Sequence, residues 1–386
     1  MLLNKRLNSV SSSLIRELKE KANQFDDIID FTLGEPHLSH LTYSVIKEQL
    51  DQQITINSIG YPNFYGLTSL KEAICEYCAI NYHQHYESTS EIIVTSGCSE
   101  GLRAVLETVL NEGDEVIIFE PAFSLYQSMT TLCGGAVVAY NLHETNLSIT
   151  EEKLLSCVGP KTKVILLNSP HNPTGHVFNE SDLAIIKKVA LQNQLFIIVD
   201  EIYRELIYDD KPFISLGTDN ELRSRLFVIN GFSKSHAMTG WRIGYILGPK
   251  QYMKQVGIVH QNLVACTCVI SQYAALEAIK HNEITQTLKQ YYDENRQQLV
   301  TKLTPYFEEI ITPLGGFYLY AKIPTRCLNS YDYANNLLIE AKVAVVPSVA
   351  FQAKDTRYIR ISYCCDKDNL LNGISRIQAY NHTKLI

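Results

Sequence analysis

The chain has 386 residues, 46% hydrophobic and 19% charged, which suits a globular protein with one large and one small domain. Its formal net charge of −7 and the lack of a Lys/Arg-rich tract argue against nucleic acid as a partner. No apolar stretch near the start has the length of a signal peptide, and the later apolar runs are far shorter than the ~20 residues of a membrane helix.

The ten cysteines are scattered along the chain rather than arranged in a framework. Cys75 and Cys78 form a CxxC pair, but they lie in a segment with helical periodicity, and no second pair follows at zinc-binding spacing. We interpret them as buried thiols of a reducing compartment. The sequence therefore predicts a soluble, cytoplasmic protein that contacts no membrane and binds no metal ion.

The N-terminal part begins with an arm and a polar helix over 14–23, followed by the run FTLGEP, which turns at Gly34. Pro, Asn and Gly then make a loop of residues 60–66, which contains Tyr61, before a segment with apolar residues at helical spacing over 70–82. Taken alone, Gly34 marks a simple turn, and Tyr61 is one of 23 tyrosines in the chain.

A short apolar strand ends at Gly97, and an amphipathic helix over 100–110 follows Cys98 and Ser99. The free N–H groups at a helix N-terminus and the positive end of the helix dipole attract anions. A nucleotide site needs a GxGxxG run, which is missing here. The strand, the tight turn and the helix start therefore predict an anion site of another kind.

The next two strands each run into a turn that could face a ligand. The strand over 115–119 is followed by Phe123, although an aromatic side chain just past a strand end most often lines the core. The strand over 163–168 runs into the turn NPTG, which contains Asn172, and we interpret the neighbouring His171 as structural.

Five apolar residues, 195–199, form a strand of the kind that is buried on both faces of a parallel sheet, and Asp200 ends it. Ligands of open parallel sheets bind at the carboxyl ends of the strands. A buried carboxylate without a partner is costly, so Asp200 needs one there. Tyr203 follows one helical turn later, and we interpret Glu201 as an acid at a helix start.

Residues 231–245 read GFSKSHAMTGWRIGY and follow a strand-like run. Lys234 lies between apolar residues and glycines, and desolvation lowers the pKa of an amine and makes it a better nucleophile. Arg242 is bracketed by glycines, which let backbone approach a ligand closely, and a guanidinium suits the oxygens of a phosphate. Such a lysine is what a bond to an aldehyde cofactor requires.

The pattern changes after two long helical stretches, 251–281 and 283–306. Strands and short helices follow over 315–320, 333–341, 343–347 and 358–363. In the last of these, Arg360 lies between two isoleucines on an alternating strand and therefore points away from them. An exposed strand arginine is the ordinary interpretation of such a residue.

In their order along the chain, the segments from Gly34 to Arg360 resemble the motifs of class I and II aminotransferases, which depend on pyridoxal 5′-phosphate (PLP). The most specific of them is S-K-x(4)-T-G-x-R-x-G-Y. The resemblance implies fold type I, with a large domain (46–284) built on a mostly parallel seven-stranded-type sheet flanked by helices. A smaller α+β domain comprises 1–45, with the N-terminal arm, and 285–386. The alternation of apolar strands and helices independently indicates an α/β fold with right-handed crossovers.

The resemblance also implies the catalytic residues. Lys234 binds PLP covalently and later moves a proton, Asp200 keeps the ring nitrogen charged, and Tyr203 reaches the phenolic oxygen. The other cofactor-binding residues that it implies are Gly97, Cys98, Ser99, Phe123, Asn172, Arg242 and Tyr61.

Within this set, the turn at 97–99 and Arg242 hold the phosphate, and Phe123 stacks on the ring. Position 231 is glycine here, as in some subgroups, whereas many relatives carry serine there for the phosphate, and whether Ser233 takes over that contact stays open.

Substrate binding and assembly follow from the same resemblance. Gly34, Asn172 and Arg360 contact the substrate carboxylate, with Arg360 gripping it through two hydrogen bonds. Tyr61 reaches the phosphate of the neighbouring subunit, which implies a homodimer with shared active sites.

The expected function is transfer of an amino group between an L-amino acid and a 2-oxo acid such as 2-oxoglutarate. The run NGFSKSHAMTGWRIG resembles a bacterial subgroup that acts on aromatic amino acids or on N-acetyl-LL-diaminopimelate, which are the favoured substrates. An aspartate aminotransferase and a PLP-dependent C–S β-lyase stay open as alternatives, and so does a non-catalytic ligand-binding module.

Overall fold

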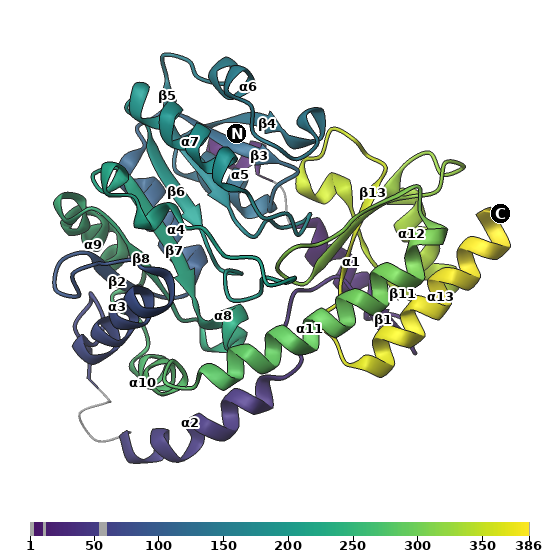
Figure 1. The fold of residues 1–386 in the computed structure, drawn as a ribbon, viewed down its shortest axis with the longest axis horizontal. Helices are drawn as coiled ribbons and strands as arrows, with labels where there is room; N and C mark the ends of the chain where they lie inside the picture. The colour runs from purple at the N-terminus through teal and green to yellow at the C-terminus, as the bar shows by residue number, and fades with distance from the viewer. Residues whose placement is uncertain (1–3, 11–12, 54–59, 386) are drawn as a thin grey trace.

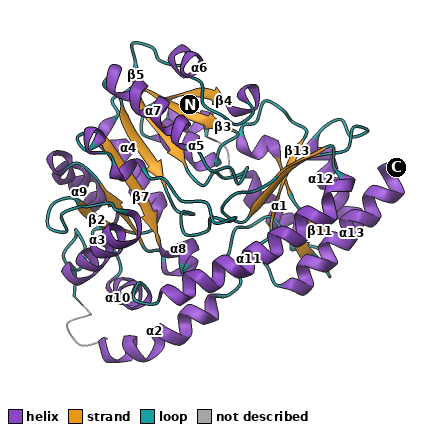
Figure 2. Cartoon of the chain, in the orientation of Figure 1, coloured by secondary structure: helices purple, strands orange, loops and turns teal. Residues whose placement is uncertain are grey.

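The computed structural model describes residues 4–10, 13–53 and 60–385. Its described residues form a seven-stranded sheet, a four-stranded sheet and a two-stranded ribbon, with helices packed against the two larger sheets (Figures 1 and 2). Within the described residues, no helix combines the length and the apolar character needed to cross a membrane.

The larger sheet has seven strands in the order β2-β8-β7-β6-β5-β3-β4. All neighbouring strands are parallel except that β8 is antiparallel to both β2 and β7. The strands are β2 (Ile92–Thr95), β3 (Glu115–Glu120), β4 (Ala136–Asn141), β5 (Thr162–Asn168), β6 (Phe196–Asp200), β7 (Leu226–Gly231) and β8 (Gly244–Leu247). This order and direction confirm the predicted α/β fold with a mostly parallel sheet.

Both faces of this sheet are buried, which explains the continuous apolar runs in its strands. In β6, Ile197 and Val199 face one core cluster while Ile198 faces another, as the two-residue period of a strand requires. The first cluster is covered by α3 (Thr68–Tyr82), α7 (Glu180–Gln192) and α10 (Val269–Ala278). The second is covered by α4 (Cys98–Val109), α5 (Ser124–Leu132) and α9 (Lys250–Val264).

The smaller sheet has four antiparallel strands in the order β12-β13-β10-β9, and β1 pairs with β11 in a parallel ribbon beside it. These strands are β1 (Ile29–Asp30), β9 (Glu309–Ile311), β10 (Tyr318–Lys322), β11 (Val343–Ala344), β12 (Val346–Pro347) and β13 (Tyr358–Ser362). The larger sheet lies within 92–247 and the four-stranded sheet within 309–362. We retain as a proposal the division into 46–284 and, for the small domain, 1–45 with 285–386.

The remaining helices join or cover these sheets. They are α1 (Leu14–Ala22), α2 (Ser39–Gln53), α6 (Glu151–Ser156), α8 (Phe232–Ser235), α11 (Asn282–Leu303), α12 (Ser330–Ala341) and α13 (Lys367–Leu385). Short 3-10 helices are η1 (Lys5–Ser9), η3 (Leu142–Thr145), η4 (Leu216–Thr218), η5 (Asn220–Leu222), η6 (Thr239–Trp241), η7 (Thr304–Tyr306) and η8 (Ser348–Phe351). In Figure 1, α11 and α13 lie side by side, and the two helices are in contact.

Two local predictions were wrong. The expected helix over 251–281 is broken between Val264 and Val269, where Ala265 has a φ of 60° and the Thr267 hydroxyl donates to the Val94 carbonyl (3.0 Å). Residues 201–205 form turns instead of a helix after β6. At the first place the buried contact is that of Thr267 with Val94, and at the second it is the hydrogen bond that Glu201 accepts from Gln84.

Candidate active site

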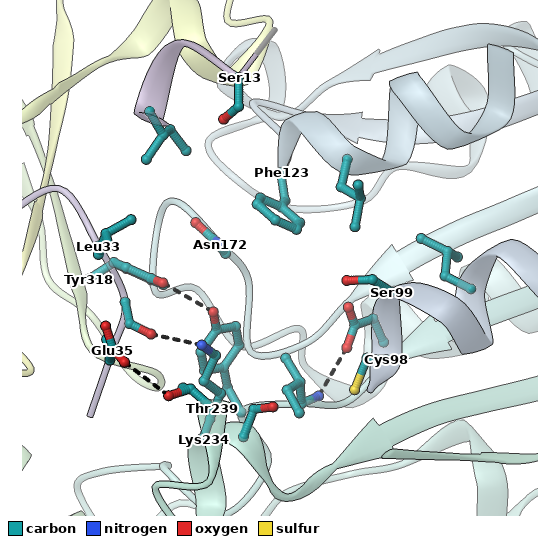
Figure 3. Close-up of a pocket in the computed structure, with 18 of the residues that line it drawn as sticks. Ser13, Leu33, Glu35, Cys98, Ser99, Phe123, Asn172, Lys234, Thr239 and Tyr318 are labelled. Atoms are coloured by element: carbon teal, nitrogen blue, oxygen red, sulfur yellow. Dashed lines mark hydrogen bonds between the residues drawn. The ribbon is translucent and has the colours of Figure 1, made fainter. Parts of the chain in front are cut away.

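A cavity of about 530 Å³ lies where the parallel strands β3, β5, β6 and β7 end, and the smaller sheet and α1 form its other walls (Figure 3). Most of the residues predicted for the site line this cavity. They are Gly34, Cys98, Ser99, Phe123, Asn172, Asp200, Tyr203, Lys234, Arg242 and Arg360. The carboxyl ends of parallel strands meet at one edge of a sheet, which brings residues far apart in sequence together here.

Lys234 lies on the single helical turn α8, which follows β7 directly. Its Nζ donates a hydrogen bond to the Gly34 carbonyl at 2.7 Å, across the cavity wall. Burial lowers the pKa of the Lys234 amine, since a charged ammonium is poorly solvated there. The structure thus holds an amine that sheds its proton more easily than an exposed lysine.

Asp200 ends β6 and is buried at the bottom of the cavity. Its two oxygens accept separate hydrogen bonds, Oδ2 from the Tyr126 hydroxyl (2.8 Å) and Oδ1 from the Ile202 N–H (3.1 Å). Burial raises the pKa of Asp200 to about 6, and the hydrogen bond from Tyr126 partly opposes that effect. Tyr126 was not predicted, although it lies three residues after Phe123 and one turn into the following helix.

Tyr203 and Tyr318 meet on the opposite side of the cavity, where their hydroxyl oxygens are 3.2 Å apart. Tyr318 comes from β10 in the smaller sheet and was also missed by sequence reasoning. A Cβ atom at Gly34 would overlap the Tyr318 hydroxyl, so only glycine lets the 33–35 segment lie this close. The contact between the two hydroxyls links the turn after β6 to the smaller sheet at the cavity.

Arg360 is 2% exposed and points from β13 into the cavity, away from its two isoleucine neighbours. Its Nη1 donates to Asn172 Oδ1 (2.9 Å) and its Nη2 to the Thr32 carbonyl (2.6 Å). The guanidinium also lies over the Tyr318 ring, 4.1 Å from its centroid. Within the described part of the chain, its Nε has no hydrogen-bond partner, and each Nη uses only one of its two N–H groups in these bonds, so donors remain for a ligand.

At the other end of the cavity, glycines allow β8 to approach the start of α4. A Cβ at Gly97, whose φ is +77°, would lie 2.6 Å from Arg242 Nη2, and one at Gly244 would lie 2.9 Å from the Cys98 backbone nitrogen. A Cβ at Gly231 would lie 2.8 Å from the Gly244 Cα, so the backbone here does not accept the serine that many relatives carry. Ser233 lines the cavity instead.

The sequence model of the aminotransferase class I and II family matches residues 26–377 of the chain. The protein belongs to this family. It is 33% identical over 382 residues to the probable N-acetyl-LL-diaminopimelate aminotransferase of Bacillus subtilis, covering 98% of this chain and 95% of that one. It is 32% identical over 382 residues to an aspartate aminotransferase of Pyrococcus abyssi, covering 98% of each chain.

Solved structures agree with this assignment. The aromatic aminotransferase from Pyrococcus horikoshii superposes with a TM-score of 0.89 at 30% identity, covering 99% of each chain. The aspartate aminotransferase from Thermotoga maritima gives a TM-score of 0.90 at 29% identity, covering 98% of this chain and all of the other (100%). This protein is therefore a transaminase of fold type I.

Members of this family use PLP, and the cavity of this aminotransferase fits that cofactor. The Lys234 amine is desolvated, and a buried carboxylate at Asp200 has hydrogen-bond donors but no ion pair among the described residues. The glycines at positions 97 and 244 leave room beside the N-terminus of α4, where the helix dipole favours an anion. The Lys234 amine suits the aldehyde of the cofactor, the Asp200 carboxylate suits its ring nitrogen, and the space beside α4 suits its phosphate.

Gly97 and Tyr61 do not line the cavity of this aminotransferase. Gly97 lies directly behind it, against the Arg242 guanidinium. Tyr61 is 91% exposed on the loop before α3, so a single chain does not bring it to the site. Its expected role in the neighbouring subunit stays a prediction.

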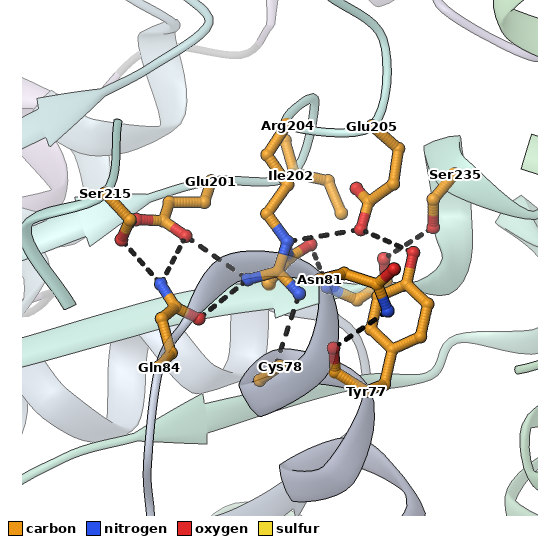
Figure 4. Close-up of polar contacts among 12 residues, drawn as sticks. Tyr77, Cys78, Asn81, Gln84, Glu201, Ile202, Arg204, Glu205, Ser215 and Ser235 are labelled. Carbon is orange, nitrogen blue, oxygen red and sulfur yellow. Dashed lines mark hydrogen bonds and ion pairs between the residues drawn. The ribbon is translucent and has the colours of Figure 1, made fainter. Parts of the chain in front are cut away.

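Glu201 is not the helix-start acid that we predicted. It is fully buried and forms an ion pair with Arg204 (3.3 Å), also buried, beneath the end of β6 (Figure 4). Gln84 bonds to both partners, donating to Glu201 (3.1 Å) and accepting from Arg204 (2.9 Å). The role of Glu201 is thus decided by its neighbours in space, Gln84 from the segment after α3 and Arg204 from the turn after β6.

Proposed function

We propose that this aminotransferase binds PLP through Lys234 and moves an amino group between an L-amino acid and a 2-oxo acid such as 2-oxoglutarate. Aromatic amino acids or N-acetyl-LL-diaminopimelate are the favoured donors, and aspartate is the alternative. The observation that carries the proposal is the convergence of the desolvated Lys234 amine with Asp200, Asn172 and Arg360 on one cavity. The names of the relatives support each of these donors and do not separate them.

When bound, PLP supplies an aldehyde that accepts the amino group and a charged ring that takes up the electron pair of the substrate Cα–H bond. Lys234 acts as the base that removes the Cα proton and returns it to the neighbouring cofactor carbon. A lowered pKa suits this role, since it leaves more of the Lys234 amine unprotonated near neutral pH. Its hydrogen bond to the Gly34 carbonyl orients Nζ toward the substrate side.

Asp200 is the partner of the cofactor's ring nitrogen in this proposal. Its carboxylate is held from both sides by Tyr126 and by the Ile202 N–H, so its orientation is set before a ligand binds. In this proposal the Tyr203 hydroxyl and the Asn172 amide would bind the phenolic oxygen of the cofactor. Because Asn172 Oδ1 already accepts from Arg360, its amide nitrogen is left to donate.

Arg360 binds the α-carboxylate of the substrate. Its guanidinium is fixed by Asn172 and the Thr32 carbonyl, which keeps the fork in one orientation and lowers the entropic cost of binding. Arg242 and the backbone at 97–99 hold the phosphate, and Phe123 covers one face of the ring.

We further propose a homodimer in which Tyr61 completes the phosphate site of the partner. Mixing Lys234→Ala with Tyr61→Ala chains tests this, because a mixed dimer contains one site with both native residues. Activity that appears on mixing two variants of low activity supports the shared site. A mixture no more active than its components contradicts it.

The substrate proposal is tested by single-turnover titration of the PLP form with a panel of amino acids, monitoring conversion of the cofactor to its amine form by absorbance. We expect aromatic amino acids or N-acetyl-LL-diaminopimelate to convert the cofactor fastest. Fastest conversion by aspartate selects the alternative. No conversion by any amino acid refutes the proposed function.

A further inference from the structure

Tyr318 lines the cavity but has no task in the scheme above. It comes from β10 in the smaller sheet, and its hydroxyl oxygen lies 3.2 Å from that of Tyr203, a contact that Figure 3 marks with a dashed line. Its ring lies beneath the Arg360 guanidinium, whose carbon is 4.1 Å from the ring centroid. Tyr318 therefore touches both the residue proposed for the phenolic oxygen and the residue proposed for the α-carboxylate.

The direction of the hydrogen bond between the two hydroxyls decides where each hydrogen points. Burial raises the pKa of Tyr203 and of Tyr318, so each hydroxyl keeps its single hydrogen near neutral pH. Within the described ranges, the Tyr318 hydroxyl makes no hydrogen bond other than the one with Tyr203. If Tyr203 were the donor, the Tyr318 hydrogen would be buried without an acceptor, which costs free energy. Donation by Tyr318 avoids that cost and leaves the Tyr203 hydrogen for a ligand.

Two neighbours hold the Tyr318 side chain in this orientation. The Gly34 backbone lies so close that a Cβ atom there would overlap the Tyr318 hydroxyl. On the ring face, the Arg360 cation is attracted to the π electrons, and its charge partly opposes the rise in the pKa of Tyr318. A phenol beside a positive charge is a better hydrogen-bond donor. The donor to Tyr203 is thus strengthened and set in place before the cofactor binds.

We propose that Tyr318 is a positioning residue, which donates to the Tyr203 oxygen and so directs the Tyr203 hydrogen at the phenolic oxygen of the cofactor. This assignment rests on the proposed function. A hydroxyl that itself accepts a hydrogen bond is a stronger donor, because bonds in a chain polarise one another. Tyr318 therefore stabilises negative charge on the phenolic oxygen through Tyr203, without touching the cofactor.

The test measures the pH at which the absorbance of the lysine-bound PLP changes, in Tyr318→Phe, Tyr203→Phe and the double variant. The spectral pKa rises when the phenolic oxygen loses a donor, because that oxygen then holds the proton of the neighbouring nitrogen more strongly. We expect a rise of about 0.3 to 0.8 in Tyr318→Phe, which is part of the worth of one neutral hydrogen bond, and a larger rise in Tyr203→Phe. The double variant should match Tyr203→Phe, since Tyr318 acts only through that hydroxyl.

A matched variant separates this effect from a loss of stability. Tyr318→Phe keeps the ring beneath Arg360, so only the hydroxyl is lost. Tyr333→Phe likewise removes one buried hydroxyl of the smaller domain, which donates to Asn381 Oδ1 (2.9 Å) and does not line the cavity. We expect Tyr333→Phe to lower the Tm and to leave the spectral pKa unchanged.

The other titratable and charged groups near the two hydroxyls and the Lys234 amine are the same in every variant. They are Glu35, Cys98, Asp200, Arg242, Arg360 and Cys364. A difference in the spectral pKa between the variants therefore reports the removed hydroxyls.

An unchanged spectral pKa in Tyr318→Phe, or shifts of the two single variants that add in the double variant, would overturn the assignment and leave the proposed function standing. A protein that binds PLP at Lys234 and converts no amino acid refutes the transaminase scheme, while the spectral comparison still decides the role of Tyr318. A protein that binds no PLP contradicts both.

Discussion

Replacing Tyr126 with phenylalanine tests how the chain keeps Asp200 ionised. The substitution removes the hydroxyl that donates to Asp200 Oδ2 at 2.8 Å and leaves the ring in place. The bond from the Ile202 N–H to Oδ1 remains. Because Tyr126 is 3% exposed, no bulk water replaces the lost donor.

The expected size of the effect follows from the burial of the carboxylate. A hydrogen bond to a charged group contributes about 1.5–3 kcal/mol, which corresponds to a rise of roughly 1 to 2 in the pKa of Asp200. Its pKa is already raised to about 6 by burial, so the variant carboxyl is protonated over part of the neutral range. A protonated Asp200 cannot support a positive ring nitrogen, and the rate falls as the pH decreases through the raised pKa.

The assay is the single-turnover rate with the best amino acid between pH 6 and 9, and the control is Tyr252→Phe, a tyrosine outside the cavity. In Tyr126→Phe, the acidic limb of the rate profile should move up by about 1 to 2 pH units, and the rate should approach that of the unaltered enzyme at pH 9. A profile that is lowered equally at every pH would refute the reasoning, since it indicates a packing defect instead.

Three further predictions concern catalysis and stability. Asp200→Ala should retain PLP weakly and react very slowly, and near-normal single-turnover rates would contradict its role at the ring nitrogen. Arg204→Met leaves the buried Glu201 carboxylate without its cation, so calorimetry should show a loss of about 3–5 kcal/mol, whereas Lys250→Ala, in an exposed ion pair, should change the Tm little. Burial lowers the pKa of His236 to about 3. Between about pH 6.5 and pH 3, the His236 imidazole therefore takes up a proton in the unfolded chain but stays neutral in the folded protein. Stability is therefore lost as the pH falls from about 6.5 toward 3, and His236→Gln should flatten this decline in Tm; an unchanged slope would show that His236 is not the source.

The strands and their ends were predictable because buried parallel strands are continuous apolar runs that stop at polar turns. Asp200 is the last residue of β6, and Asn172 and Lys234 lie in the turns just after β5 and β7, so the sheet itself brings them to one edge. The break between α9 and α10 was not predictable from periodicity, because it depends on the contact of Thr267 with a distant strand.

The missed residues of the cavity share one physical cause. Tyr126 and Tyr318 acquire their positions from contacts made by separate elements, α5 and β10. With 23 tyrosines in the chain, no local pattern distinguishes the one that donates to Asp200. Glu201 was misread for the same reason, since its partner Gln84 comes from a remote segment.

The central claim is that the Lys234 ε-nitrogen forms the bond to the cofactor aldehyde. Borohydride reduction of the PLP-incubated protein, followed by proteolysis and mass spectrometry, tests it most directly. We expect the added pyridoxyl phosphate mass on the peptide that contains Lys234, and its loss from that peptide in Lys234→Ala. Label on another lysine, or a protein that stays colourless and unlabelled, would contradict the account.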